Sequence, residues 1–112
     1  MDISVKHMER VDLVKVGGRV DHQTAPDLEK ALRAIVDEGR HNIVVDLGDV
    51  NYISSAGLKA LQATAKAVRA GILGGDVRLA GLKPEIKEIF ETIGFNHLFK
   101  IYDTPLDAVG SF

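Results

Sequence analysis

Two adjacent serines, Ser54 and Ser55, are the residues whose type and position could support chemistry. They lie near the end of residues 46–58, where a β-branched run, a polar link and a helix start follow one another. A helix start carries free backbone N–H groups and the positive end of the helix dipole, and both favour an anion. A serine in this position either caps the helix or presents a hydroxyl that can be modified by phosphate.

An enzymatic use of Ser55 would require a base and an oxyanion hole. Ile53 stands where the Gly-x-Ser-x-Gly motif of a nucleophile elbow needs its first glycine. A catalytic set of Ser55, His22 and Asp46 is therefore disfavoured, and we expect His22 to be a solvent-exposed turn residue.

Three other kinds of site lack their motifs. The chain contains no Gly-x-x-x-x-Gly-Lys-Ser/Thr phosphate loop, no His-x-x-x-His pair and no cysteine. An aspartyl-phosphate site at Asp46 and Asp49 would lack the adjacent acidic pair and the strand-borne lysine that this chemistry uses. We therefore expect no cofactor, no metal and no enzymatic activity.

Length and composition indicate one ordinary globular domain over residues 1–112. Hydrophobic residues make up 46% and charged residues 27% of the chain, and 14 basic against 16 acidic residues give a net charge of −2. This balance disfavours direct nucleic-acid binding. No apolar run approaches the roughly 18 residues of a spanning helix, and residues 1–10 lack a signal-peptide core. We expect a cytoplasmic protein without membrane insertion.

The elements that position the serines alternate along the chain. Cap residues and apolar periodicity predict helices that begin after Thr24, at Ser54 or Ser55, at Pro84 and at Pro105. Alternating or β-branched runs predict five strands, over residues 3–8, 11–16, 43–47, 77–80 and 98–102.

This order predicts an α/β fold with a mixed sheet of four or five strands and α-helices packed against it. The first two strands are expected to form a hairpin, and the others to be parallel. Gly17 and Gly18 are expected to end the second strand, and residues 48–53 to form a polar link. The helical spacing of Leu58 and Leu61 predicts core positions, although both are also candidates, with Tyr52, for a docking surface.

The whole chain resembles the STAS domain, in particular the bacterial anti-sigma factor antagonists. The central motif is Ser54-Ser55-Ala56-Gly57-Leu58, preceded by Tyr52-Ile53. Further segments match in order, at residues 18–25, 46–47, 74–75, 84–90, 94–95 and 98–101. The resemblance departs from the Asp-Ser-Ser-Gly form of the motif, because Ser54 replaces the acid and Ala56 replaces the second hydroxyl residue.

The resemblance implies that Ser55 is a phosphorylation site. It also implies that Asp21 lies on a loop beside this serine, and that Ser54, Ala56, Gly57 and Tyr52 shape the surroundings in which a partner binds.

The resemblance further implies partner switching. The unphosphorylated domain would sequester an anti-sigma factor that is itself a serine kinase, phosphorylation would release it, and a PP2C-type phosphatase would restore the first state. ATP and magnesium would belong to the kinase. The alternative implied by the same fold is an unphosphorylated docking subunit of a lipid ABC transporter or of another regulatory complex.

Overall fold

The computed structural model describes all 112 residues and begins with an antiparallel hairpin. Strand β1 (Asp2–His7) pairs along its whole length with β2 (Asp12–Val20). The Met8 N–H donates to the Val11 carbonyl at 2.9 Å, so a two-residue turn joins the strands. The predicted hairpin is confirmed.

Three parallel strands complete a five-stranded sheet in the order β1-β2-β3-β4-β5. They are β3 (Asn42–Ile53), β4 (Asp76–Ala80) and β5 (Ile101–Tyr102). Four helices accompany them, α1 (Ala25–Asp37), α2 (Ser55–Ala70), α3 (Pro84–Thr92) and α4 (Pro105–Gly110), with a 3₁₀ turn at Phe95–His97. The predicted α/β class and mixed sheet are confirmed.

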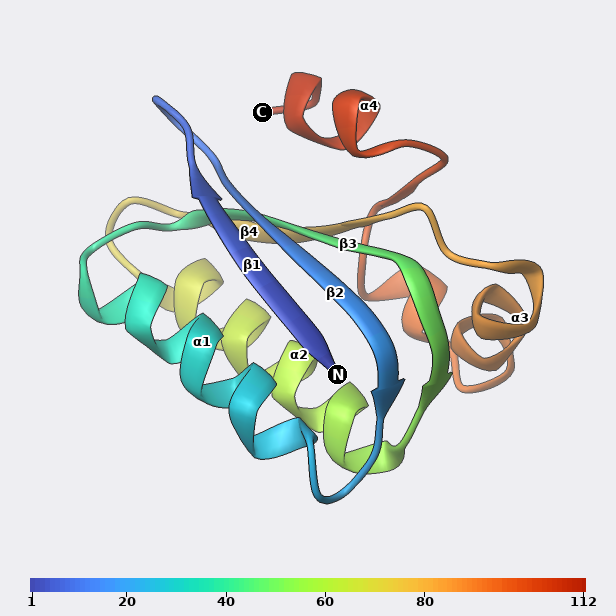
Figure 1. Cartoon of the computed structure of the whole chain (residues 1–112). Coiled ribbons are helices and arrows are strands. Elements are labelled where there is room, and N and C mark those ends of the chain that lie inside the picture. Colours follow the sequence, from blue (N-terminus) through green and yellow to red (C-terminus); the bar gives the residue numbers. More distant parts are fainter.

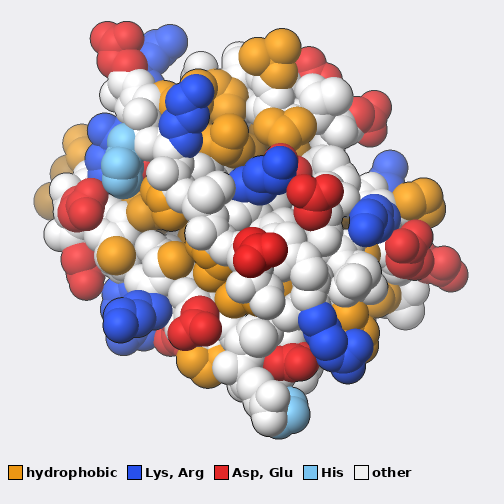
Figure 2. Space-filling view, in the orientation of Figure 1, with side chains coloured by type: hydrophobic (Ala, Val, Ile, Leu, Met, Phe, Trp, Pro, Cys, Tyr) orange, Lys and Arg blue, Asp and Glu red, His pale blue; other side chains and the backbone are white.

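The helices cover both faces of the sheet. Helices α1 and α2 lie side by side against one face (Figure 1), and the large core between them and the sheet also includes Ile86 and Phe90 of α3. Helix α4 packs on the opposite face, where Ala108 meets Val44 and Ala80. Acidic and basic side chains are interspersed over the face of the molecule seen in Figure 2.

Two predicted strand ends are wrong in the region that leads to the serines. Strand β2 does not stop at Gly17 but continues to Val20, through register shifts between Lys15 and Gly17 and between Gly18 and Arg19. Strand β3 likewise continues through residues 48–53, predicted to be a link. The two extensions pair with each other through their backbones. Such pairing needs no apolar side chains, so the hydrophobic pattern from which strands are predicted does not reveal it.

The last strand is shorter than the predicted residues 98–102. Only Ile101 and Tyr102 pair with β4, opposite Leu79 and Ala80. Phe99 does not pair with β4. Its side chain is buried in the main core, where it packs beside the ring of Phe95 in the preceding 3₁₀ turn.

Candidate functional site

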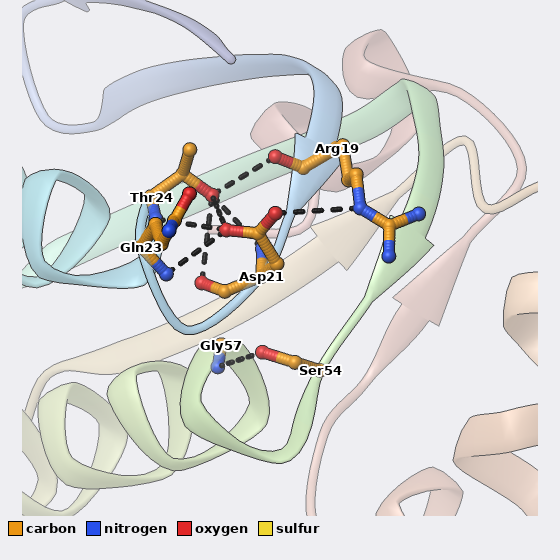
Figure 3. Close-up of polar contacts among 6 residues, drawn as sticks. All are labelled: Arg19, Asp21, Gln23, Thr24, Ser54 and Gly57. Carbon is orange, nitrogen blue, oxygen red and sulfur yellow. Dashed lines mark hydrogen bonds and ion pairs between the residues drawn. The ribbon is translucent and has the colours of Figure 1, made fainter.

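Ser54 joins the end of β3 to the start of α2. Its backbone is extended, and its Oγ accepts a hydrogen bond of 3.4 Å from the Gly57 N–H, as Figure 3 shows. Its own N–H donates to the Val20 carbonyl at 2.8 Å. Ser54 is therefore the half-buried cap that ties the helix start to the end of β2.

Ser55 is the first residue of α2 and is exposed to solvent. Its side chain takes no part in the cap, because the Ser54 oxygen serves there. The neighbouring N–H groups of the first turn and the helix dipole give this position a positive potential. The structure thus separates two serines that are equivalent in the sequence, with one inside the cap and one on the surface.

Gly57 allows the helix start to approach both strands closely. A Cβ at this position would lie 2.7 Å from Cγ1 of Val20 and 2.9 Å from Cγ1 of Ile53, closer than carbon atoms pack. Ala56 is half-buried and packs against the same core. The absence of a side chain at Gly57 therefore seats the serine pair directly on the strand ends.

Asp21 follows β2 and organises the loop beside the helix start. Its Oδ1 accepts hydrogen bonds from the N–H groups of Gln23, at 2.9 Å, and Thr24, at 3.1 Å. Thr24 Oγ1 accepts from the Asp21 N–H at 2.9 Å and donates to the Arg19 carbonyl at 2.9 Å (Figure 3). The expectation that Thr24 caps α1 with its hydroxyl is wrong, because this loop already occupies the hydroxyl.

The same contacts keep Asp21 charged. The backbone N–H of Thr24 is the main cause that lowers the pKa of this carboxyl, and hydrogen bonds from Gln23 and Arg19 lower it further. Asp21 is the residue directly after Val20, whose carbonyl binds the Ser54 N–H. A fixed negative charge therefore lies beside the start of α2.

Arg19 and Tyr52 form an exposed pair across β2 and β3. They are opposite each other in the strand register, and the guanidinium lies 3.9 Å from the centre of the Tyr52 ring. Arg19 Nε also donates to Asp21 Oδ2 at 3.3 Å, and Tyr52 remains 39% exposed. No sequence pattern marks Arg19 as part of this site, because its pairing with Tyr52 depends on the continuation of β2 beyond Gly17 and Gly18.

Other candidate residues lie elsewhere. Leu58 and Leu61 are buried in the main core, so the docking interpretation of these leucines is wrong. Asp46 lies seven residues before Ile53 along β3, or roughly 20 Å, and its Oδ1 accepts from the Gly48 N–H at 2.9 Å. His22 is exposed on the Asp21 loop. Ser55, His22 and Asp46 therefore do not meet.

The structure contains no cluster of three His, Cys, Asp or Glu side chains that could hold a metal ion. None of its helices has the length and apolar character needed to cross a membrane.

Comparison with known proteins identifies the family of the chain. The profile of the STAS domain matches residues 2–108. The Bordetella bronchiseptica protein BtrV, whose name describes an anti-sigma factor antagonist, is 36% identical to this chain over 108 residues. The match covers 94% of this chain and 91% of BtrV. An anti-sigma factor antagonist from Mycobacterium paratuberculosis has a crystal structure with a TM-score of 0.88 and 30% identity, covering 98% of this chain and 92% of that chain.

The fold alone is shared with the Bacillus cell fate determinant SpoIIAA in its phosphorylated form, with a TM-score of 0.77 and 14% identity over 98% of each chain. Anti-sigma factor antagonists are regulators and not enzymes. The chain belongs to the STAS domain family and, within it, to the anti-sigma factor antagonists.

Proposed function

We propose that this protein is an antagonist whose binding to an anti-sigma factor is switched by phosphorylation of Ser55. The unmodified protein sequesters an anti-sigma factor that is a serine kinase, phosphorylation releases it, and a PP2C-type phosphatase reverses the modification. The observation that carries this proposal is the exposed Ser55 hydroxyl at the start of α2, left free because Ser54 forms the cap.

The local structure is suited to accept a phosphate without unfolding. A phosphoserine adds about −1.5 to −2 charges at pH 7. At Ser55 this charge would meet the N-terminal end of a 16-residue helix, where the dipole and free N–H groups favour an anion. The phosphate would not disturb the cap, because Ser54 and Gly57 form it without the Ser55 side chain.

The phosphate would leave the fold intact but would weaken the binding of a partner that covers Ser55. The partner would have to desolvate the phosphate beside the ionised Asp21, and a loss of only about 1.4 kcal/mol lowers affinity tenfold. The stacked Arg19 and Tyr52 offer this partner an exposed contact of the kind that is enriched at protein interfaces. The switch would therefore act at the surface, through charge, with little change inside the domain.

The first test is the intact mass of the protein after incubation with ATP, magnesium and each serine-kinase anti-sigma factor of its source organism. We expect one phosphate on the wild type and on Ser54→Ala, the matched control, and none on Ser55→Ala. A phosphate that persists in Ser55→Ala would refute the assignment of the site. No modification by any of these kinases would refute the switch.

The second test measures binding to the kinase that modifies the protein. Ser55→Ala should bind constitutively, whether or not ATP is present. Ser55→Asp should fold with an unchanged circular dichroism spectrum but bind at least about tenfold more weakly, since it places a charge beside Asp21. Tight binding by a folded Ser55→Asp variant would contradict the electrostatic mechanism.

A further inference from the structure

Strand β1 is a free edge of the sheet. It pairs with β2 on one side, and no strand follows it on the other (Figure 1). The edge is six residues long, regular and without proline, and the Val5 side chain is 37% exposed. Such an edge presents unpaired N–H and C=O groups to which another strand can bind.

The hairpin geometry decides which backbone groups are unpaired. Met8 and Val11 form a hydrogen-bonded pair beside the turn. Because hydrogen-bonded and non-hydrogen-bonded pairs alternate in an antiparallel ladder, the even-numbered residues of β1 bond to β2. The N–H and C=O groups that point away from the sheet are therefore those of Ile3, Val5 and His7.

We propose that β1 pairs antiparallel with β1 of a second copy, about a two-fold axis at Ser4, and joins the two sheets into one. Hydrogen-bonded pairs across this axis must join outward-pointing residues of both copies. Ile3 therefore faces Val5 of the second copy, and each such pair exchanges two hydrogen bonds.

Charge selects this register among the allowed ones. With Ile3 opposite Val5, Asp2 of each copy lies opposite Lys6 of the other, so the symmetry produces the favourable pair twice. A shift by two residues in either direction places Asp2 opposite Met8 or Ser4 and removes both charge pairs. Opposite charges directly across a strand pair stabilise it, and like charges destabilise it.

The two faces of the joined strands also match. Ile3 packs against the main core, and Val5 shares its face of the sheet, so pairing extends the apolar face across the axis and covers the exposed Val5. Asp2, Ser4 and Lys6 lie on the other face. The second copy therefore finds apolar residues opposite apolar ones and a cation opposite each anion.

The dimer should be weak and dependent on concentration, because a six-residue strand pair buries less than the roughly 1,600 Å² of a standard interface. Sedimentation velocity of the full chain over a concentration series tests it. We expect the wild type to pass from monomer to dimer. Asp2→Lys and Lys6→Glu should each raise the dissociation constant at least about tenfold, since each change creates two like-charge pairs.

The double variant that combines Asp2→Lys with Lys6→Glu should restore the wild-type dissociation constant, because it re-forms both pairs with the charges exchanged. Val5→Pro should abolish the dimer but keep the wild-type circular dichroism spectrum, because it removes an N–H that points away from β2. A wild type that stays monomeric, or charge variants that dimerise unchanged, would overturn the proposal. So would a double variant that fails to recover.

Discussion

Gly57→Ala tests whether the close approach of α2 to the strand ends positions the serine pair. The new methyl would lie 2.7 Å from Cγ1 of Val20, about 0.8 Å short of the roughly 3.5 Å at which carbon atoms pack. Neither Val20 nor Ile53 can move away freely, because both are buried at paired positions of the sheet. The helix start would have to shift outward.

Two opposing effects set the size of the change. Overpacking a dense core costs about 1–3 kcal/mol. Replacing glycine by alanine inside a helix returns about 1 kcal/mol, because alanine restricts the unfolded chain. The net loss in the free energy of unfolding should therefore be at most about 2 kcal/mol, or a fall of several degrees in melting temperature.

A double-mutant cycle isolates the steric effect from the helix propensity. Val20→Ala removes the nearer contact, so Gly57→Ala should be better tolerated in that background than in the wild type. We expect urea titrations of the four proteins to give a coupling free energy of about 1–2 kcal/mol, less than the full overpacking cost because the contact with Ile53 remains. Losses that add to within about 0.5 kcal/mol would refute the reasoning.

Three further changes test the site and the opposite end of β2. In a urea titration, Ser54→Ala should lower the free energy of unfolding by about 0.5–1 kcal/mol, a modest loss because the cap hydrogen bond is long at 3.4 Å. Ser55→Ala should change the free energy of unfolding by less than about 0.5 kcal/mol in the same titration. Arg40→Met should lower the melting temperature more than the combination of Asp12→Leu with Arg40→Met, because the single variant leaves the fully buried Asp12 carboxylate with the His7 imidazole, at 3.0 Å, as its one remaining side-chain partner. Asp21→Asn should melt below the wild type at neutral pH. This difference should disappear as the pH falls through 3.8 and below, because a carboxyl whose pKa is lower in the folded chain stabilises the fold only while it is ionised.

Each of these expectations has a distinct contrary result. Equal losses from Ser54→Ala and Ser55→Ala would contradict the division of roles between the serines. A double variant at Asp12 and Arg40 that melts below the single one would show that the pair stabilises the fold outright. A melting difference for Asp21→Asn that does not change with pH would show that the loop does not depend on the ionised carboxylate.

Helix positions could be predicted well because their signals are local. Pro26, Pro84 and Pro105 each mark a first helical turn, and the apolar stripes that follow them repeat within a few residues. The same locality led to the misassignment of the Thr24 hydroxyl. A threonine before Ala25 has the sequence pattern of a helix cap, but its hydroxyl instead accepts a hydrogen bond from the Asp21 N–H and donates one to the Arg19 carbonyl.

Strand ends were predicted less well, because a strand depends on a partner far away in the sequence. Gly17 and Gly18 carry no β signal, yet they pair with Asp49 and Val50, more than thirty residues later. Conversely, Leu98 has the apolar character of a strand residue, but β4 provides pairing only farther along the chain.

Residue order alone places two serines and a small Ala-Gly pair at a helix start, and this motif points to the family. Tertiary structure decided that Ser54 is the cap and Ser55 the exposed hydroxyl, because the Val20 carbonyl holds Ser54 in place. It also decided that Asp21 and the stacked Arg19 lie beside them. These contacts follow from the pairing of β2 with β3, two segments joined through α1, and no short-range pattern encodes that register.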